Sequence, residues 1–349
     1  MASFLSFSKK AARLCITADA DVFDSEFLGS WTLEGFDVVY LTFTKDTTTF
    51  VHELENIKHG LSVSESYAVI CFGHAAAFCL EYFLKSPNTA RISALVAYYP
   101  TSIPDPVVDY PPHLRVLVHF ANQGVDVIYP SAGRAHKSYR EVRSISSGIG
   151  TGDRLRMGYV AYVYTGARQG FAEKNLTEYN RISAQLAWSR TLKVLQRAFQ
   201  RETDLEQAWD DIQEGRYFSC ETSNSLDKFD KKAPSVIYAP TRQGATGTAE
   251  LSNFYESNFG GKAPSSMRLR LLSRTVSADR VVDELYMSFK HSQKMDWILP
   301  DVPPTNKHVE ITLIDMGSFR GGKLCSEKVY WDQASVLVQA GLIDSKLVP

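Results

Sequence analysis

The chain has 349 residues and a formal net charge of −1, from 38 basic and 39 acidic side chains. This length suits about two domains, and without a basic surplus a nucleic-acid partner is disfavoured. No apolar run approaches the roughly 20 residues of a membrane helix, and residues 1–10 lack the order of a secretory signal. Five cysteines stand singly, without metal-ligand spacing. We therefore predict a cytoplasmic protein that binds neither nucleic acid nor membranes.

The first 200 residues alternate short apolar runs with helical patterns. The apolar runs are 13–17, 36–43, 67–72, 92–100, 114–120 and 159–164, and the helical patterns are 49–61, 75–84 and 176–200. Nearly continuous apolar strands separated by helices indicate a parallel sheet covered on both faces. We therefore predict an α/β domain over residues 1–200.

The strand-to-helix turn at residues 71–76 lies where an α/β-hydrolase carries its nucleophile. With residues 97–101, 117–121 and 169–172, it makes this domain resemble the dienelactone hydrolases, or carboxymethylenebutenolidases. The resemblance implies an α/β-hydrolase fold with a degenerate triad. Gly73 stands in the place of the nucleophile, Gln169 in the place of the histidine base, and Asp126 matches the acid. We therefore expect a scaffold or partner surface here.

Cys71 and His74 leave a hydrolytic alternative open. A Cys/His pair can supply nucleophile and base where the two side chains touch, and the substrate would then be a lactone or ester. Cys71 lies on the buried strand, however, where a thiol is more often an inert core residue.

Residues 201–235 predict a short helix over 204–212, followed by a polar linker. The second domain, 236–349, has a helical pattern over 248–259 and then strands over 269–276, 280–291, 308–316 and 324–332. Hairpin-linked strands behind helices indicate an antiparallel, curved sheet wrapped on helices. We predict an α+β cone that encloses a cavity.

The strand 283–291 alternates between apolar and polar side chains. Its apolar face carries Asp283, Leu285, Met287, Phe289 and His291, and its other face carries Glu284, Tyr286, Ser288 and Lys290. Because successive strand side chains point to opposite faces, we expect the first set to line the interior. This places a carboxyl group at one end of the interior face and an imidazole at the other.

Asp332 ends the last predicted strand, directly before an apolar run. One interpretation is that it caps a short helix beginning near Ala334, since aspartate satisfies unpaired amides there. The other is a carboxylate aimed into an aromatic pocket, where burial raises its pKa towards values useful for proton transfer.

Three features carry a second resemblance: the segment 295–307 with its Pro-Pro-Thr turn, the hairpin at 319–324, and the spacing of Asp332, Gln339 and Gly341. Residues 236–345 are similar to the SnoaL-like polyketide cyclases, whose cone is shared with ketosteroid isomerase, scytalone dehydratase and limonene-epoxide hydrolase. The whole chain resembles carboxymethylenebutenolidase-like proteins that carry this cone behind a hydrolase-like domain.

This resemblance implies that Asp332 is the general acid/base, paired with His291, and that Asp283 is a second carboxylate. The expected substrate-binding side chains are Tyr238, Tyr255, Tyr286, Trp297, Tyr330 and Glu284. We predict an enzyme of secondary metabolism, without cofactor or metal, that cyclises, isomerises, dehydrates or opens the epoxide of an oxidised polyketide. A homodimer follows by family analogy. A non-catalytic ligand-binding protein is the remaining alternative.

Overall fold

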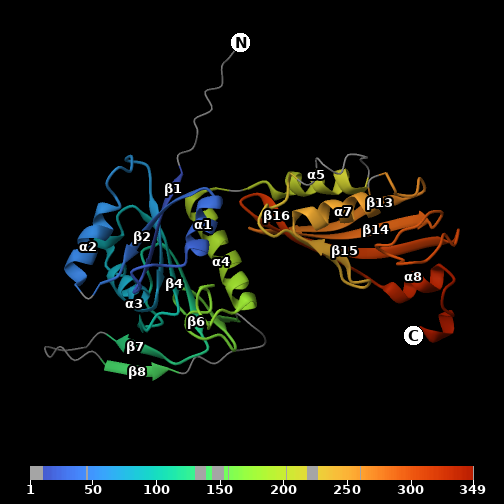
Figure 1. Cartoon of the computed structure of the whole chain (residues 1–349). Helices are drawn as coiled ribbons and strands as arrows, with labels where there is room; N and C mark the ends of the chain where they lie inside the picture. Colours follow the sequence, from blue (N-terminus) through green and yellow to red (C-terminus); the bar gives the residue numbers. More distant parts are fainter. Residues whose placement is uncertain are drawn as a thin grey trace, which may run out of the picture. The chain divides into compact units, whose positions relative to one another are not determined.

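The computed structural model describes residues 11–44, 46–129, 139–143, 153–155, 157–201, 203–217, 227–259 and 261–348. Residues 1–10, and residues 220–226 of the predicted linker, lie outside the described residues. The chain divides into two compact units, Met1–Glu202 and Thr203–Pro349. Figure 1 colours the chain from blue at its N-terminus to red at its C-terminus.

The N-terminal unit is built on a parallel sheet. Its strands are β1 (Ala12–Ala18), β2 (Phe36–Thr42), β3 (Tyr67–Phe72), β4 (Ile92–Tyr98), β5 (Ser102–Pro104), β6 (Arg115–Ala121), β7 (Val125–Tyr129), β8 (Tyr139–Arg143), β9 (Asp153–Leu155) and β10 (Val160–Tyr164). Its helices are α1 (Ser25–Leu33), α2 (Thr47–Asn56), α3 (Gly73–Tyr82) and α4 (Arg181–Phe199), with a 3-10 turn at Ser86–Thr89. The main sheet has the order β2-β1-β3-β4-β6-β10-β9, with only β9 antiparallel among the described strands, and β5, β7 and β8 form a separate small sheet.

Helices cover both faces of the parallel sheet, as Figure 1 shows. On one face, α2 and α3 contribute Phe50 and Leu80 to the core that also holds Cys71 of β3. On the other face, Trp31 of α1 stacks on Trp188 of α4 with ring centroids 3.9 Å apart. The predicted α/β architecture is confirmed, whereas the likeness to hydrolases stays a prediction.

Helix α1 was not predicted, because its apolar face is short. Its buried residues are Phe27 and Trp31, too few for a helical period. The helix begins where Asp24 caps it, its Oδ1 accepting from the backbone N–H groups of Glu26 at 2.9 Å and Phe27 at 3.1 Å.

The C-terminal unit combines one mixed sheet with helices. Its elements are α5 (Leu205–Tyr217), β11 (Ser235–Tyr238), β12 (Gln243–Thr246), α7 (Thr248–Asn258), β13 (Arg268–Val276), β14 (Arg280–Lys290), β15 (His308–Arg320), β16 (Lys323–Trp331), α8 (Gln333–Gln339) and a 3-10 turn at Ser345–Leu347. The sheet order is β12-β11-β16-β15-β14-β13. All its pairs are antiparallel except β11 with β16. Helix α5, which we expected in a linker, belongs to this unit and extends to Tyr217.

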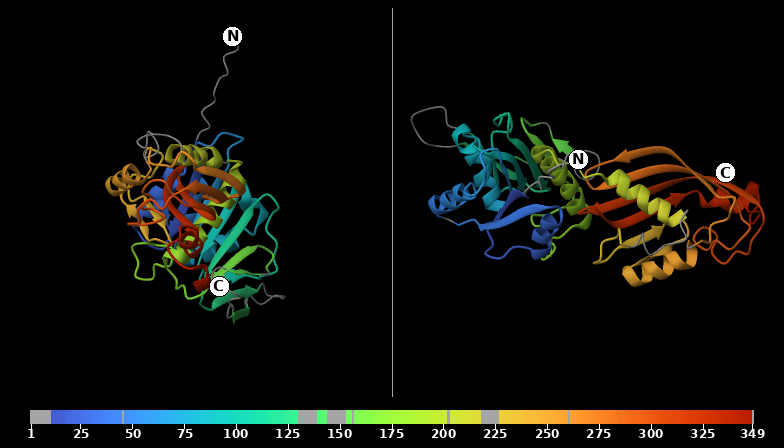
Figure 2. Two further views of the ribbon diagram at one scale, coloured as in Figure 1. Left: turned by 90° about the vertical axis from the view of Figure 1, so that its right-hand side faces the viewer. Right: turned by 90° about the horizontal axis from the view of Figure 1, so that it is seen from above.

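Helices α5 and α7 cover one face of this sheet, which we call the inner face (Figure 2). The alternation predicted for β14 is confirmed, since Asp283, Leu285, Met287 and Phe289 are buried while Lys290 is exposed. The inner face and the two helices share one hydrophobic core. None of the described helices combines the length and apolar character that crossing a membrane requires.

Candidate active site

Helix α5 presents three hydrogen-bond donors to the inner face. Trp209, Gln213 and Arg216 are spaced by four and three residues, which places them on one side of a helix. All three side chains are buried. Their donor groups therefore need partners on the sheet.

Three carboxyl groups on adjacent strands meet these donors: Asp283 of β14, Asp315 of β15 and Glu327 of β16. We call them the carboxyl row. Strand register brings them together, because Asp283 lies directly opposite Asp315 and Glu327 lies opposite Gly317. All three residues are buried, with 0% of their surface exposed.

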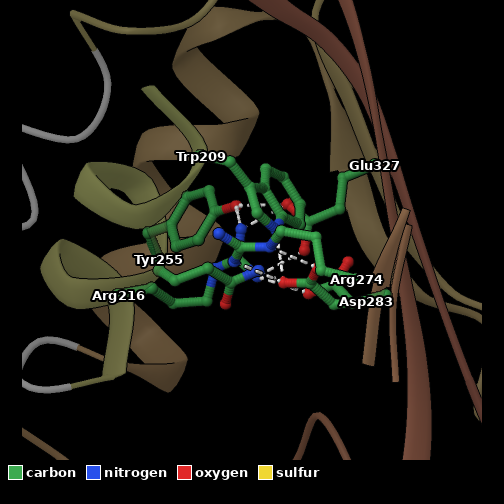
Figure 3. A network of polar contacts seen from close by, with 8 residues as sticks. Trp209, Arg216, Tyr255, Arg274, Asp283 and Glu327 are labelled. Atoms are coloured by element: carbon green, nitrogen blue, oxygen red, sulfur yellow. Dashed lines mark hydrogen bonds and ion pairs between the residues drawn. The ribbon is translucent and has the colours of Figure 1, made fainter. Parts of the chain in front are cut away.

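Every member of the carboxyl row accepts from α5, and Asp315 accepts from two of its residues. Figure 3 shows Asp283 and Glu327 with their partners. Trp209 Nε1 donates to Asp283 at 2.8 Å, and Gln213 Nε2 donates to Asp315 Oδ2 at 2.8 Å. Arg216 donates through both terminal nitrogens to the two carboxylate oxygens of Glu327. Its Nη1 also lies 3.4 Å from Asp315 Oδ2. Helix and sheet are thus joined by four pairs of polar side chains.

The charges in this interior do not balance. Arg274 of β13 neutralises Asp283 through bonds of 2.7 and 2.8 Å, and Arg216 neutralises Glu327. Two guanidinium groups therefore face three carboxyl groups, which leaves Asp315 without a counter-ion of its own. Burial, and next the charge of Glu327, raise the pKa of Asp315 well above its ordinary value, against the opposing effects of Arg216 and Gln213. These effects favour the neutral form of the Asp315 carboxyl group.

Some buried polar atoms of this unit have no hydrogen-bond partner among the described residues. Among the described residues, no hydrogen-bond partner exists for Asp315 Oδ1, Gln213 Oε1 or the hydroxyl group of Tyr238, all of them buried. Tyr255 is satisfied, since its hydroxyl accepts from Arg216 Nη2 at 3.2 Å. Buried polar atoms are normally paired, so each of these atoms is a candidate for contact with a ligand or water.

The predicted inward orientation of Asp332 is wrong. Asp332 is exposed and caps α8, its Oδ1 accepting from the N–H groups of Ala334 at 3.0 Å and Ser335 at 3.3 Å. The Ser335 hydroxyl donates to its Oδ2 at 2.5 Å. These hydrogen bonds, above all those from Ser335, lower the pKa of Asp332 below its ordinary value. The capping interpretation is the one that the structure supports.

His291 is buried on the inner face, as predicted, but far from the carboxyl row. It lies eight residues beyond Asp283 along the strand direction, about 26 Å at the rise of a β-strand. Its Nδ1 accepts from the Thr305 N–H group at 3.2 Å, and burial lowers its pKa. Strand register also separates it from Asp332, because Trp331 pairs with Leu313 and Lys290 with His308. Asp332, His291 and Asp283 therefore do not form one site.

The expected substrate-binding residues divide between the two faces of the sheet. Tyr238, Tyr255 and Trp297 are buried in the core of the unit, with the rings of Tyr238 and Trp297 5.3 Å apart. Tyr286, Tyr330 and Glu284 lie on the outer face, where Tyr330 is 40% exposed and Glu284 accepts from Ser273 Oγ at 3.0 Å. The placement of these last three residues in the pocket is wrong, because the strand alternation points them outward.

The three positions of the expected degenerate triad have different surroundings. Gly73 lies at the β3–α3 turn with a φ of +56°, a left-handed conformation that favours glycine. Gln169 Nε2 donates to the carbonyl oxygen of Tyr99 at 3.2 Å. Asp126 lies on β7 of the small sheet, opposite Ser102.

Cys71 and His74 have separate partners, which contradicts the nucleophile and base pair. The Cys71 thiol is buried in the core beneath α3 and donates to the Val96 carbonyl at 3.4 Å. Burial raises its pKa well above the ordinary value, so the reactive thiolate is disfavoured. The exposed imidazole of His74 instead contacts Asp19 through Nδ1 at 2.9 Å.

Arg216, Asp315 and Glu327 were missed from the sequence, although two of them carried a signal. Asp315 continues the alternation of Val309, Ile311 and Leu313, and Glu327 is in phase with Val329. A carboxyl group in phase with apolar neighbours predicts a buried acid. Arg216 gave no such signal, because the helix was expected to end at residue 212.

No family model and no curated protein matches the chain. Solved structures with SnoaL-like and ketosteroid isomerase-like folds match a part of it. A provisionally assigned SnoaL-like polyketide cyclase from Jannaschia sp. CCS1 is 14% identical, with a TM-score of 0.33 over 41% of this chain and 97% of its own. TsrD from Streptomyces laurentii is 15% identical, with a TM-score of 0.32 over 41% of this chain and 98% of its own.

A hypothetical protein from Catenulispora acidiphila with a ketosteroid isomerase-like fold, in complex with trimethylamine, is 14% identical. It has a TM-score of 0.30 over 41% of this chain and 95% of its own. Similarities at these values carry no argument about what this chain does. A functional conclusion therefore has to rest on its own side chains.

Proposed function

We propose that the C-terminal unit is an acid–base enzyme whose proton donor is Asp315. The observation that carries this proposal is the buried excess of carboxyl groups, three against two guanidinium groups, in which Asp315 shares Arg216 with Glu327. A neutral carboxylic acid in an apolar interior can protonate an oxygen atom or donate a hydrogen bond to it, as an enzyme needs at neutral pH.

The residues around Asp315 support its proposed role as proton donor. The carboxylate charge of Glu327 favours the protonated form of Asp315, and the guanidinium group of Arg216 opposes this effect. The Gln213 amide donates to Asp315 Oδ2, whereas the buried Oδ1 has no hydrogen-bond partner among the described residues and is the oxygen that we assign to the ligand. The hydroxyl group of Tyr238 is a second buried donor without a partner among the described residues, and burial raises its pKa.

The aromatic side chains of this core favour a flat, conjugated substrate. The rings of Trp297 and Trp331 lie 5.8 Å apart, and both contact Tyr238. Such walls suit an oxidised polyketide. The reaction is then a cyclisation, isomerisation, dehydration or epoxide opening in which Asp315 protonates a carbonyl or epoxide oxygen. Because Asp332 is an exposed helix cap, we assign the acid–base role expected of it to Asp315 in the carboxyl row.

The test is turnover of candidate oxidised polyketides by the full-length protein, followed by mass spectrometry. Asp315→Asn removes the proton donor and keeps the shape, so we expect product formation to fall by about 100-fold or more. The matched control is Asp332→Asn, which changes an exposed carboxylate and should leave turnover unchanged. A folded Asp315→Asn variant with normal turnover would refute the proposal, and tight binding without product from any substrate would favour a carrier.

We also propose that the chain forms a homodimer through the outer face of the sheet in the C-terminal unit. Ile314 and Tyr330 pair across β15 and β16 and are 36% and 40% exposed. Large apolar side chains gathered on one sheet face support a contact with a second copy.

A further inference from the structure

The N-terminal unit has a second place suited to chemistry, at the carboxyl edge of its parallel sheet. The chain leaves β1 through α1 towards β2, and it leaves β3 through α3 towards β4, so the strand order reverses between β1 and β3. Helices α1 and α3 lie on opposite faces of the sheet. In open α/β sheets, ligands bind in the crevice outside the carboxyl ends of the strands at such a point.

Two residues with acid–base chemistry stand on either side of this reversal. Asp19 follows β1, and His74 follows the end of β3 by two residues. Asp19 Oδ2 lies 2.9 Å from His74 Nδ1 and accepts from the His74 backbone N–H group at 3.2 Å. A carboxylate at Nδ1 fixes the proton there and leaves Nε2 as an acceptor. The side chain of His74 is 70% exposed, so Nε2 is open to a ligand.

Gly73 makes this contact possible. A Cβ atom at position 73 would lie 2.9 Å from Asp19 Oδ2, and the φ of +56° is one that other residues rarely adopt. The carboxylate therefore takes the space that a side chain would fill at the apex of the turn. The same glycine that leaves the β3–α3 turn without a nucleophile gives Asp19 room to contact His74.

The surroundings of the pair are acidic. Tyr99, which has an unusual φ of +37°, donates from its hydroxyl group to Glu173. Burial, and to a smaller extent the charges of Asp24 and Asp19, raise the pKa of Glu173. A site with these carboxylates repels anions, so its ligand is uncharged or cationic.

We propose that His74, oriented by Asp19, is a general base that activates water for attack on uncharged acyl compounds. Nε2 takes a proton from water as the water oxygen bonds to the acyl carbon, and the carbonyl electron pair moves to its oxygen. The tetrahedral intermediate then reforms the carbonyl group and expels the alcohol oxygen, which receives the proton from the imidazolium. The products are a carboxylic acid and an alcohol, with no covalent intermediate on the protein. This site is independent of the carboxyl row.

The experiment uses the full-length protein with 4-nitrophenyl acetate as an uncharged probe. His74→Gln should lower the rate of nitrophenolate release by about 100-fold, the range of a general base. The control is His52→Gln, which changes another exposed imidazole, hydrogen-bonded to Asn56 on α2, and should leave the rate unchanged. Asp315→Asn should leave it unchanged too, which separates this site from the one proposed above.

Further measurements distinguish a role of Asp19 in orienting the His74 ring from a role in folding. Asp19→Asn should lower the rate and change the His74 ring tautomer seen by nitrogen-15 NMR, with the melting temperature unchanged. The wild-type rate should fall in deuterated water, and no acetyl group should remain on the protein. A His74→Gln variant with the wild-type rate, an acetylated protein intermediate or a rate insensitive to deuterated water would each overturn the proposal.

Discussion

At the scale of single residues, the raised pKa of Asp315 follows from its burial and from the charges around it. Arg216 binds Glu327 through both terminal nitrogens and lies 3.4 Å from Asp315, and Arg274 binds Asp283 and Asp210. A further arginine beside Asp315 would favour its ionised form. Removal of Arg216 or Arg274 would leave another buried carboxylate without its counter-ion. The carboxyl row is therefore sensitive to any change in its cations.

The first prediction concerns Arg216→Met. Removing one partner of a buried ion pair leaves an uncompensated charge, so we expect the free energy of unfolding to fall by about 3–5 kcal/mol. Urea denaturation measures it. Lys228→Met is the matched control, because the Lys228–Asp211 pair is partly exposed at 2.5 Å and should contribute less than about 1 kcal/mol. Equal losses in the two variants would contradict the account.

The second prediction concerns pH. The folded-state pKa of Asp315 is raised above an unfolded value of about 3.9. The folded state therefore binds more protons, and the stability that Asp315 contributes is complete below that value and lost as pH rises towards the folded pKa. Asp315→Asn cannot titrate. Its free energy of unfolding relative to wild type should thus rise by about 1.4 kcal/mol per pH unit above pH ~4. Parallel pH profiles of the two proteins would exclude the raised pKa.

At the scale of elements, strands were easier to predict than the ends of helices. The period of two in β14 and β15 is regular over many residues, and it placed Asp283 and His291 on the buried face. The end of α5 has no comparable signal. Gly215, Arg216 and Tyr217 resemble the start of a loop in sequence, yet they form the last turn of the helix. The contacts of Arg216 with Glu327 join residues 111 positions apart, which no local pattern contains.

Asp332 shows how a resemblance can outweigh a correct local signal. An aspartate before an apolar run is an N-cap by its own chemistry, and the structure agrees. The third prediction is that Asp332→Ala lowers the free energy of unfolding by about 1 kcal/mol, since two N–H groups lose their acceptor. Asp332→Asn keeps an equivalent cap and should leave the free energy of unfolding unchanged. Urea denaturation measures both variants. A larger loss in Asn than in Ala would show that charge, and not capping, is what position 332 supplies.

At the scale of the whole molecule, each unit carries its own acid–base group. The N-terminal unit pairs His74 with Asp19 at an exposed sheet edge, whereas the C-terminal unit buries Asp315 beneath α5. The order and type of most elements followed from hydrophobic periodicity. The chemistry did not, because both pairings depend on side chains brought together by the fold.

The fourth prediction tests the proposed homodimer. Ile314→Lys and Tyr330→Lys introduce positive charges into the outer sheet face, and we expect the molar mass from light scattering to fall from that of a dimer to that of a monomer. Val63→Lys, at a fully exposed position of the N-terminal unit, is the control and should remain dimeric. A wild-type protein that is already monomeric at micromolar concentration would end this proposal.

The central claim is that Asp315 is uncharged at neutral pH, and infrared spectroscopy tests it most directly. The difference spectrum between wild type and Asp315→Asn at pH ~7 should contain the C=O stretch of a protonated carboxyl group. That band should persist in Asp332→Asn and in His74→Gln. If the wild-type protein shows only the carboxylate band at this position, Asp315 is ionised and cannot be the proton donor.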